Sequence, residues 1–129
     1  MSTELTLLVW SAVLCVALAL PYTFGVAIEH GVGAATGNRE DLPELTGWIG
    51  RARRAHANMV ENLIPFAAIV LAAQIAGKNG ALTVLGAQLF FWFRVAHAVI
   101  YIVGIPYLRT LAWLASVVGM ALIVSAFFA

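Results

Sequence analysis

Long apolar stretches alternate with short polar ones along the chain, and this pattern sets the first expectation about its fold. Four helical segments are predicted, at about residues 5–28, 47–76, 81–105 and 108–128, separated by polar or glycine-containing connections. Each has about the 20 residues that a helix needs to cross a hydrocarbon core of ~30 Å. None shows the strict alternation of barrel strands. The pattern predicts an all-α membrane protein, one domain over residues 1–129 built as a bundle of four transmembrane helices.

Composition supports a membrane location. The chain is 63% hydrophobic and 10% charged over 129 residues, and its mean hydropathy is +0.96, which is too apolar for an ordinary soluble domain. The segment Met1–Glu4 carries no Lys or Arg, so no cleavable signal is expected. A net charge of +1 gives no reason to expect a nucleic-acid partner, and the single Cys15 cannot form an intrachain disulfide. The sequence predicts a multi-pass integral membrane protein.

The basic residues outside the apolar spans predict the orientation of the chain. Most lie around the first and third connections, whereas the second connection has only Lys78. Because positively charged loops stay in the cytoplasm, both termini are expected on the non-cytoplasmic face, in the inner membrane if the source is bacterial. The residues on the expected cytoplasmic side are Arg39, Arg51, Arg53, Arg54 and Arg109.

Two polar stripes interrupt the apolar helices. On the second helix, Arg51, Arg54, Asn58, Glu61 and Pro65 recur at spacings of three and four residues, which places them on one helical face. Ionisable groups at membrane depth usually face a bundle interior or an aqueous cavity and serve a function there. This stripe therefore predicts one wall of a polar site.

The third helix supplies the opposite wall. Arg94, His97 and Tyr101 are also spaced by three and four residues. Glu61 and Arg94 are expected to pair at the deep end, because burying either charge alone would cost several kcal/mol. The shallower residues would line a pocket for a ligand that carries carboxylates, and a lipophilic second substrate would enter from the bilayer. No metal site is expected.

Arg109, just after the third connection, is expected at the rim of the same pocket, where its charge could stabilise a thiolate or another developing anion. Simpler interpretations remain open at this stage. The Glu61–Arg94 pair could be only a packing clamp, and Arg53 and His56 could anchor lipid headgroups. A small four-helix transporter is disfavoured, because the first helix has no carboxylate between its ends.

Two segments resemble one family of membrane proteins. Residues 54–66 read RAHANMVENLIPF and residues 94–101 read RVAHAVIY; both are similar to signatures of the MAPEG family, the membrane-associated proteins in eicosanoid and glutathione metabolism. The resemblance implies a homotrimer that binds glutathione between subunits near the cytoplasmic side. It also implies that Arg109 polarises the glutathione thiol. By position, the implied glutathione contacts are Arg54, Asn58, Glu61, His97 and Tyr101, with Arg94 as the deep arginine.

The expected function is therefore a glutathione-dependent transferase or peroxidase that acts on lipophilic electrophiles or hydroperoxides. Two positions differ from the family pattern. Ala57 stands where prostaglandin-synthase-type members have a further arginine, and Trp113 stands where catalytic members often present a tyrosine. These differences motivate an alternative, a non-catalytic member that binds lipid or glutathione as a scaffold.

Overall fold

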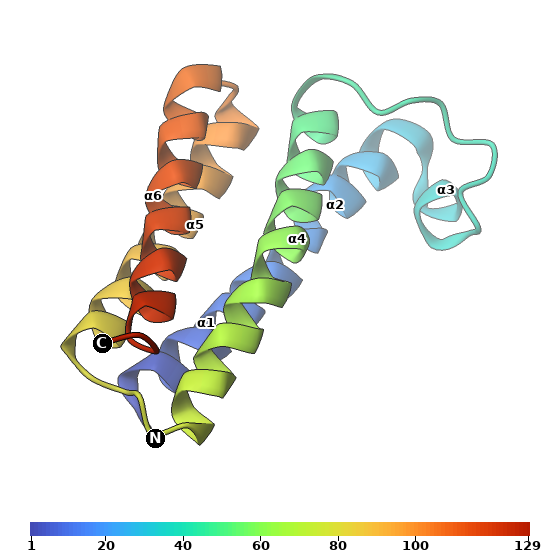
Figure 1. Ribbon diagram of the computed structural model, residues 1–129. Helices are drawn as coiled ribbons and strands as arrows, with labels where there is room; N and C mark the ends of the chain where they lie inside the picture. The colour runs from blue at the N-terminus through green and yellow to red at the C-terminus, as the bar shows by residue number, and fades with distance from the viewer.

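The computed structural model describes all residues, 1–129, and every regular element in it is a helix (Figure 1). Four stretches are long and apolar enough to cross a membrane, which confirms the predicted four-span architecture of an integral membrane protein. The helices are α1 (Thr3–Ala17), α2 (Ala19–His30), α3 (Val32–Thr36), α4 (Gly47–Ile75), α5 (Ala81–Val103) and α6 (Pro106–Ser125).

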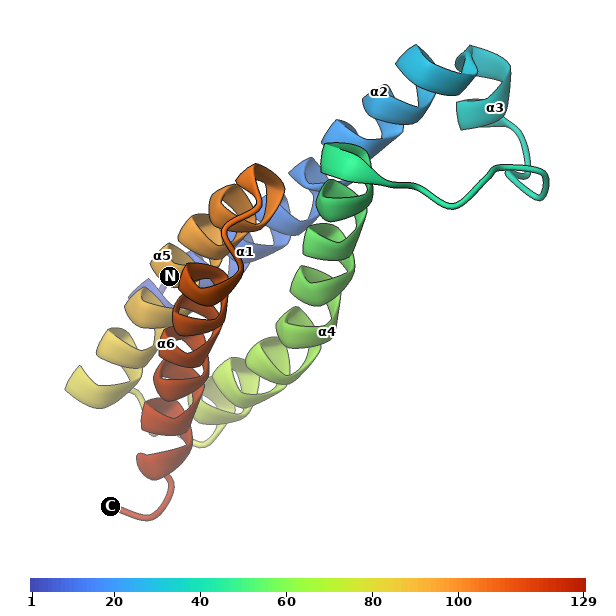
Figure 2. The same cartoon turned by 90° about the horizontal axis from the view of Figure 1, so that it is seen from above.

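The first span consists of two helices. Helix α1 ends at Ala17 and α2 begins at Ala19, so the interruption falls at Leu18. Pro21 explains its place, because proline has no N–H to donate to the carbonyl of Ala17 and its ring crowds that carbonyl. The predicted loop after this span also contains the short helix α3. Helix α2 packs against the start of α4, where Val26, Ala35 and Ile49 form a small buried cluster, and the far end of α2 projects with α3 beyond the bundle (Figures 1 and 2).

The other three spans form the bundle with α1. Helices α5 and α6 cross closely because Gly86 and Gly119 face each other: a Cβ on Gly119 would lie 2.9 Å from the backbone nitrogen of Phe90. Small residues permit such close helix approach in membranes. The apolar core lies between α1, α4 and this pair, and in it the rings of Phe66 and Phe90 stack with centroids 3.7 Å apart.

The two ends of the bundle differ in charge. Both termini and the α4–α5 turn lie at one end, and the start of α4 and the α5–α6 turn lie at the other (Figure 1). The first end carries Lys78, whereas the second carries Arg51, Arg53, Arg54 and Arg109. The predicted orientation rests on this asymmetry.

Candidate functional site

Two small cavities lie side by side at the arginine-rich end of the bundle. Their volumes are about 200 Å³ and about 170 Å³, and Tyr101 and Arg109 line both of them. The larger is lined by Asn58, His97, Tyr101, Arg109, Thr110 and Trp113, and the smaller by Arg51, Arg54, Tyr101, Gly104, Ile105, Pro106 and Arg109. The fold thus brings together all of the predicted site residues except Glu61 and Arg94.

Arg109 is held over an aromatic ring. Its guanidinium carbon lies 4.4 Å from the ring centroid of Tyr101, a cation–π distance. His97 meets the same tyrosine edge to face, with centroids 5.5 Å apart. Residues 97 and 101 are one helical turn apart on α5, and Arg109 reaches them from the first turn of α6 because Gly104 reverses the chain with a φ of +99°. The stack fixes a positive charge at the wall shared by both cavities.

Arg94 is 1% exposed and contacts Asn58, a residue that lines the larger cavity. Its Nη2 donates to Oδ1 of Asn58 at 2.7 Å, and its Nε and Nη1 have no partner. His97, 2% exposed, likewise has an unpartnered Nδ1. Buried polar groups are normally hydrogen-bonded, so unpartnered ones need an explanation such as a ligand. Arg94 and His97, which we call the deep wall of the site, therefore have unused hydrogen-bonding capacity, although only His97 lines the cavity directly.

The predicted ion pair between Glu61 and Arg94 is not formed. The side chains of Glu29 and His30 approach to 3.9 Å instead, and Glu61 is exposed. Helix geometry explains the error, because residues advance by about 100° each around the axis. Glu61 follows the fully buried Met59 by two positions and so points almost directly away from the bundle. The stripe on α4 is wide enough that one edge faces α5 while the other faces outward.

Arg51 has a structural contact that the sequence did not reveal. Its Nε donates to the backbone carbonyl of Ile102 at 3.0 Å, one of the carbonyls that a helix leaves without an internal partner at its C-terminus. A Cβ on Gly104 would lie 3.1 Å from the same Nε, a tight contact that the Arg51 side chain would have to relieve, and the φ of +99° itself favours glycine there. Arg51 thus fastens the end of α5 to α4 and also lines the smaller cavity.

Two further residues join the site without having been predicted to do so. Trp113 donates its indole Nε1–H to Oδ1 of Asn62 at 3.3 Å, and Nδ2 of Asn62 donates to the carbonyl of Asn58 at 2.8 Å. The signal for Asn62 was available, since it lies one turn after Asn58 within an apolar helix. The contact of Trp113 depends on how α6 packs against α4, which no periodicity specifies.

The charges of the site favour an anionic ligand. Arg51, Arg54 and Arg109 line the cavities, and no carboxylate lines either of them. Guanidinium groups bind carboxylates through short charge-assisted hydrogen bonds. The chain contains no group of three or more His, Cys, Asp or Glu side chains that could hold a metal ion. The arrangement is suited to binding a small molecule with more than one negative charge.

The fold and this site define a multi-pass membrane protein with an arginine-lined cavity at one end of a four-helix bundle. Comparison with known families matches residues 5–129 to the MAPEG family, and the chain belongs to that family.

Curated proteins similar to the chain include microsomal glutathione S-transferase 1 from three mammals, each matched over 58 residues. The identity is 36% for Homo sapiens, 34% for Sus scrofa and 31% for Rattus norvegicus. The matched part covers 45% of this chain and 37% of each relative. The chain therefore spans little more than a third of the length of these relatives. No solved structure matches it.

Proposed function

We propose that the protein is a membrane-bound, glutathione-dependent transferase or peroxidase acting on lipophilic electrophiles or hydroperoxides. The observation that carries this proposal is the pair of adjoining cavities, which share Tyr101 and Arg109 and contain three arginines but no carboxylate. Glutathione is an elongated tripeptide with two carboxylates, which matches this distribution of charge. Membership of the MAPEG family and the name of the similar transferases support the choice of glutathione.

In this proposal Arg51 and Arg54 bind a carboxylate of glutathione in the smaller cavity, and Asn58, His97 and Tyr101 contact its peptide groups. Arg94 lies below and fixes Asn58. Arg109 stabilises the thiolate, because a nearby fixed positive charge favours the anionic form of sulfur. The thiol proton passes to water, the sulfur forms a bond to an electrophilic carbon, and the leaving group departs with its electron pair. With a hydroperoxide, two glutathione molecules are oxidised to the disulfide while the hydroperoxide is reduced to an alcohol and water.

Glu61 supports self-association of the chain within the same proposal, and the family resemblance implies that the assembly is a homotrimer. It lies exposed midway along α4, together with Ala57, Ala68 and Ala72 on the same face. A carboxylate facing lipid at this depth is costly, whereas small residues favour close helix association. We infer that this face of α4 packs against other copies of the chain, where Glu61 completes the glutathione site. The mass of the detergent-solubilised complex tests the stoichiometry.

We further propose that residues 1–129 form one domain and that both termini face away from the cytoplasm, because the arginine-rich end carries most of the basic residues. The glutathione site then opens to the cytoplasm, while the lipophilic substrate arrives through the bilayer.

A second function is favoured by Trp113. Its indole N–H is bonded to Asn62, so it offers no donor at the position where catalytic members of the family often present a tyrosine hydroxyl. Ala57 also supplies no donor. Fewer polar contacts near the sulfur would suit a member that binds glutathione or lipid without catalysis.

Conjugation of 1-chloro-2,4-dinitrobenzene by the purified protein in detergent tests the proposal. We expect Arg109→Ala to lower kcat on the order of 10²-fold, by analogy with the loss of one charge-stabilising donor. Arg53→Ala is the matched control, because Arg53 lies at the same end of the bundle but lines neither cavity. Calorimetric binding of glutathione without any conjugation by the wild type would favour the scaffold, and an unchanged rate in Arg109→Ala would contradict the role of that arginine.

A further inference from the structure

A chain of hydrogen bonds links α6 to α5 through two asparagines of α4. Trp113 Nε1 donates to Asn62 Oδ1 at 3.3 Å. Asn62 Nδ2 donates to the Asn58 carbonyl at 2.8 Å and to Asn58 Oδ1 at 3.3 Å. Arg94 Nη2 donates to the same Oδ1 at 2.7 Å. Four side chains on three helices therefore form one connected polar network beside the larger cavity.

The two ends of this network determine which way each amide faces. Arginine and tryptophan side chains have N–H donors and no acceptor. Asn58 must therefore present its oxygen to Arg94, and Asn62 must present its oxygen to Trp113. With its oxygen engaged by Trp113, Asn62 has only its NH₂ group left to turn toward Asn58, where it meets the backbone carbonyl. Neither amide can flip without placing two donors against each other.

The network leaves the NH₂ group of the Asn58 amide free. Its Oδ1 receives two hydrogen bonds, whereas these contacts leave its Nδ2 without an acceptor in the chain. Asn58 also lines the larger cavity. We propose that Asn62 and Trp113 are positioning residues that hold the Asn58 amide with its NH₂ group ready for an acceptor oxygen of the bound ligand, which under the proposed function is glutathione.

This assignment gives Trp113 a role different from that of a hydroxyl at the same place. A tyrosine hydroxyl could donate directly to the sulfur, but the indole N–H of Trp113 is committed to Asn62. Its effect is transmitted through Asn62 to a group that binds the tripeptide. Loss of the indole N–H should therefore weaken binding of glutathione rather than slow the reaction of bound thiolate.

The first test is Trp113→Phe, which keeps an aromatic ring against the cavity and removes the N–H. We expect the KM for glutathione to rise about three- to tenfold, the range for one net hydrogen bond, with kcat at saturating glutathione and the KM for the electrophile nearly unchanged. A fall in kcat with no change in the KM for glutathione would overturn the proposal.

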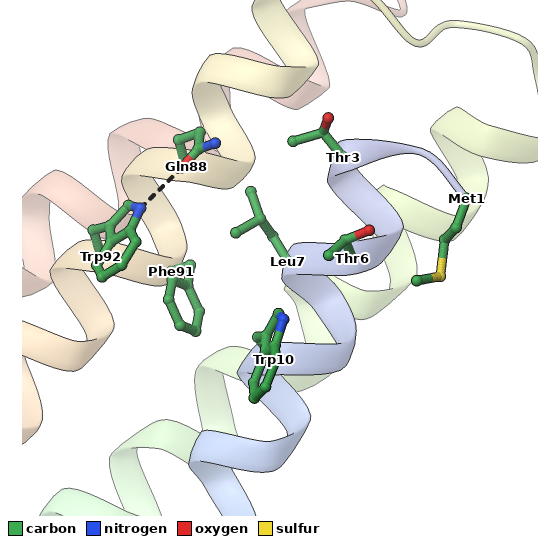
Figure 3. A pocket seen from close by; sticks show the side chains of 8 residues that line it. All are labelled: Met1, Thr3, Thr6, Leu7, Trp10, Gln88, Phe91 and Trp92. Atoms are coloured by element: carbon green, nitrogen blue, oxygen red, sulfur yellow. Dashed lines mark hydrogen bonds between the residues drawn. The ribbon is translucent and has the colours of Figure 1, made fainter.

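The chain provides a matched control in Trp92→Phe. The indole of Trp92 donates to Gln88 Oε1 at 2.9 Å, and it lines a groove between α1 and α5 together with Trp10 and Phe91 (Figure 3). This substitution removes the same type of hydrogen bond from a residue that lines neither cavity of the site. We expect it to leave the KM for glutathione unchanged.

A double-mutant cycle tests whether the effect passes through Asn62. If it does, the double variant Asn62→Ala/Trp113→Phe binds glutathione no more weakly than Asn62→Ala alone, because the indole has nothing left to orient. Additive losses would mean that the two side chains act independently, which would refute the positioning role.

A measurement without glutathione separates this inference from the proposed function. Tryptophan is present at four positions, so ¹⁵N-labelled protein in detergent gives a small set of indole N–H resonances. Asn62→Ala should move the Trp113 proton resonance upfield and leave that of Trp92 in place. If the resonance does not move, the hydrogen-bond chain is refuted and the proposed function is unaffected. A moved resonance in a protein that binds no glutathione by calorimetry refutes the ligand assignment together with the proposed function.

Discussion

The two ends of the bundle bury ionisable groups in opposite ways. At the end with the termini, Glu4 is 3% exposed and accepts a hydrogen bond from the Thr83 hydroxyl at 2.6 Å. That hydroxyl in turn accepts from the backbone N–H of Gly80 at 2.8 Å. At the other end, Arg94 is still less exposed, yet two of its three nitrogens have no partner. The cluster at the end with the termini is closed, with none of its buried polar atoms left without a partner, whereas the other leaves two nitrogens of Arg94 unpartnered beside Asn58, which lines the larger cavity.

This difference indicates what each cluster does. A satisfied polar network stabilises and orients the helices that it joins, and here it anchors α1 to the first turn of α5. An unsatisfied buried guanidinium costs stability and leaves N–H donors free for a ligand. Thr83 and Arg94 both belong to α5, Thr83 in its first turn and Arg94 nearer its other end. The two clusters therefore differ although they involve the same helix.

The largest expected effect comes from Arg94→Met, which replaces the guanidinium by an apolar side chain of similar length. We expect the affinity for glutathione to fall on the order of 10²-fold, because Asn58 loses its charged partner and the deep wall loses its positive charge. Thermal stability in detergent should stay the same or rise, since an incompletely paired buried charge is removed. Calorimetry and a melting curve measure both quantities.

Arg94→Lys provides the comparison variant, because it keeps the charge but not the planar guanidinium. Partial retention of glutathione affinity by lysine would assign the effect to charge, and complete loss would assign it to the fixed geometry toward Asn58. If Arg94→Met instead lowered stability and left glutathione binding intact, Arg94 would be a structural residue like Thr83, and the contrast between the two ends would be wrong.

Much of the fold follows from the sequence because membrane helices have strong local signatures. Length and hydropathy predicted all four spans, since these features depend on one segment at a time. The close crossing at Gly86 and Gly119 was not predicted, because it requires two helices to meet at those particular residues.

Helical periodicity predicted only part of the site. The spacing of His97 and Tyr101 placed both on one face, and Arg109 joined them through a short turn. The same reasoning failed for Glu61, because it assigned an entire stripe to the interior when α4 turns only part of it toward α5. The contact of Trp113 with Asn62 depends on the relative shift of two helices and has no signal in either segment alone.

At the closed end of the bundle, which holds Glu4 and Thr83, we expect a smaller effect that lowers thermal stability rather than glutathione affinity. Thr83→Val keeps the shape of the side chain but leaves the Glu4 carboxylate and the Gly80 N–H without their partner, and Glu4 has little access to water. Leaving buried polar groups unsatisfied costs about 1–3 kcal/mol, so the melting temperature should fall while the glutathione affinity of the folded protein stays unchanged.

Thr36→Val is the matched control for this substitution, because its exposed hydroxyl donates only to the Val32 carbonyl within α3. Exposed groups can replace such a bond with water, so we expect a much smaller change in melting temperature. Equal changes in the two variants would show that the buried network contributes nothing special. A loss of glutathione affinity in Thr83→Val would show instead that the closed end communicates with the site through α5, and the two clusters could then no longer be treated as separate.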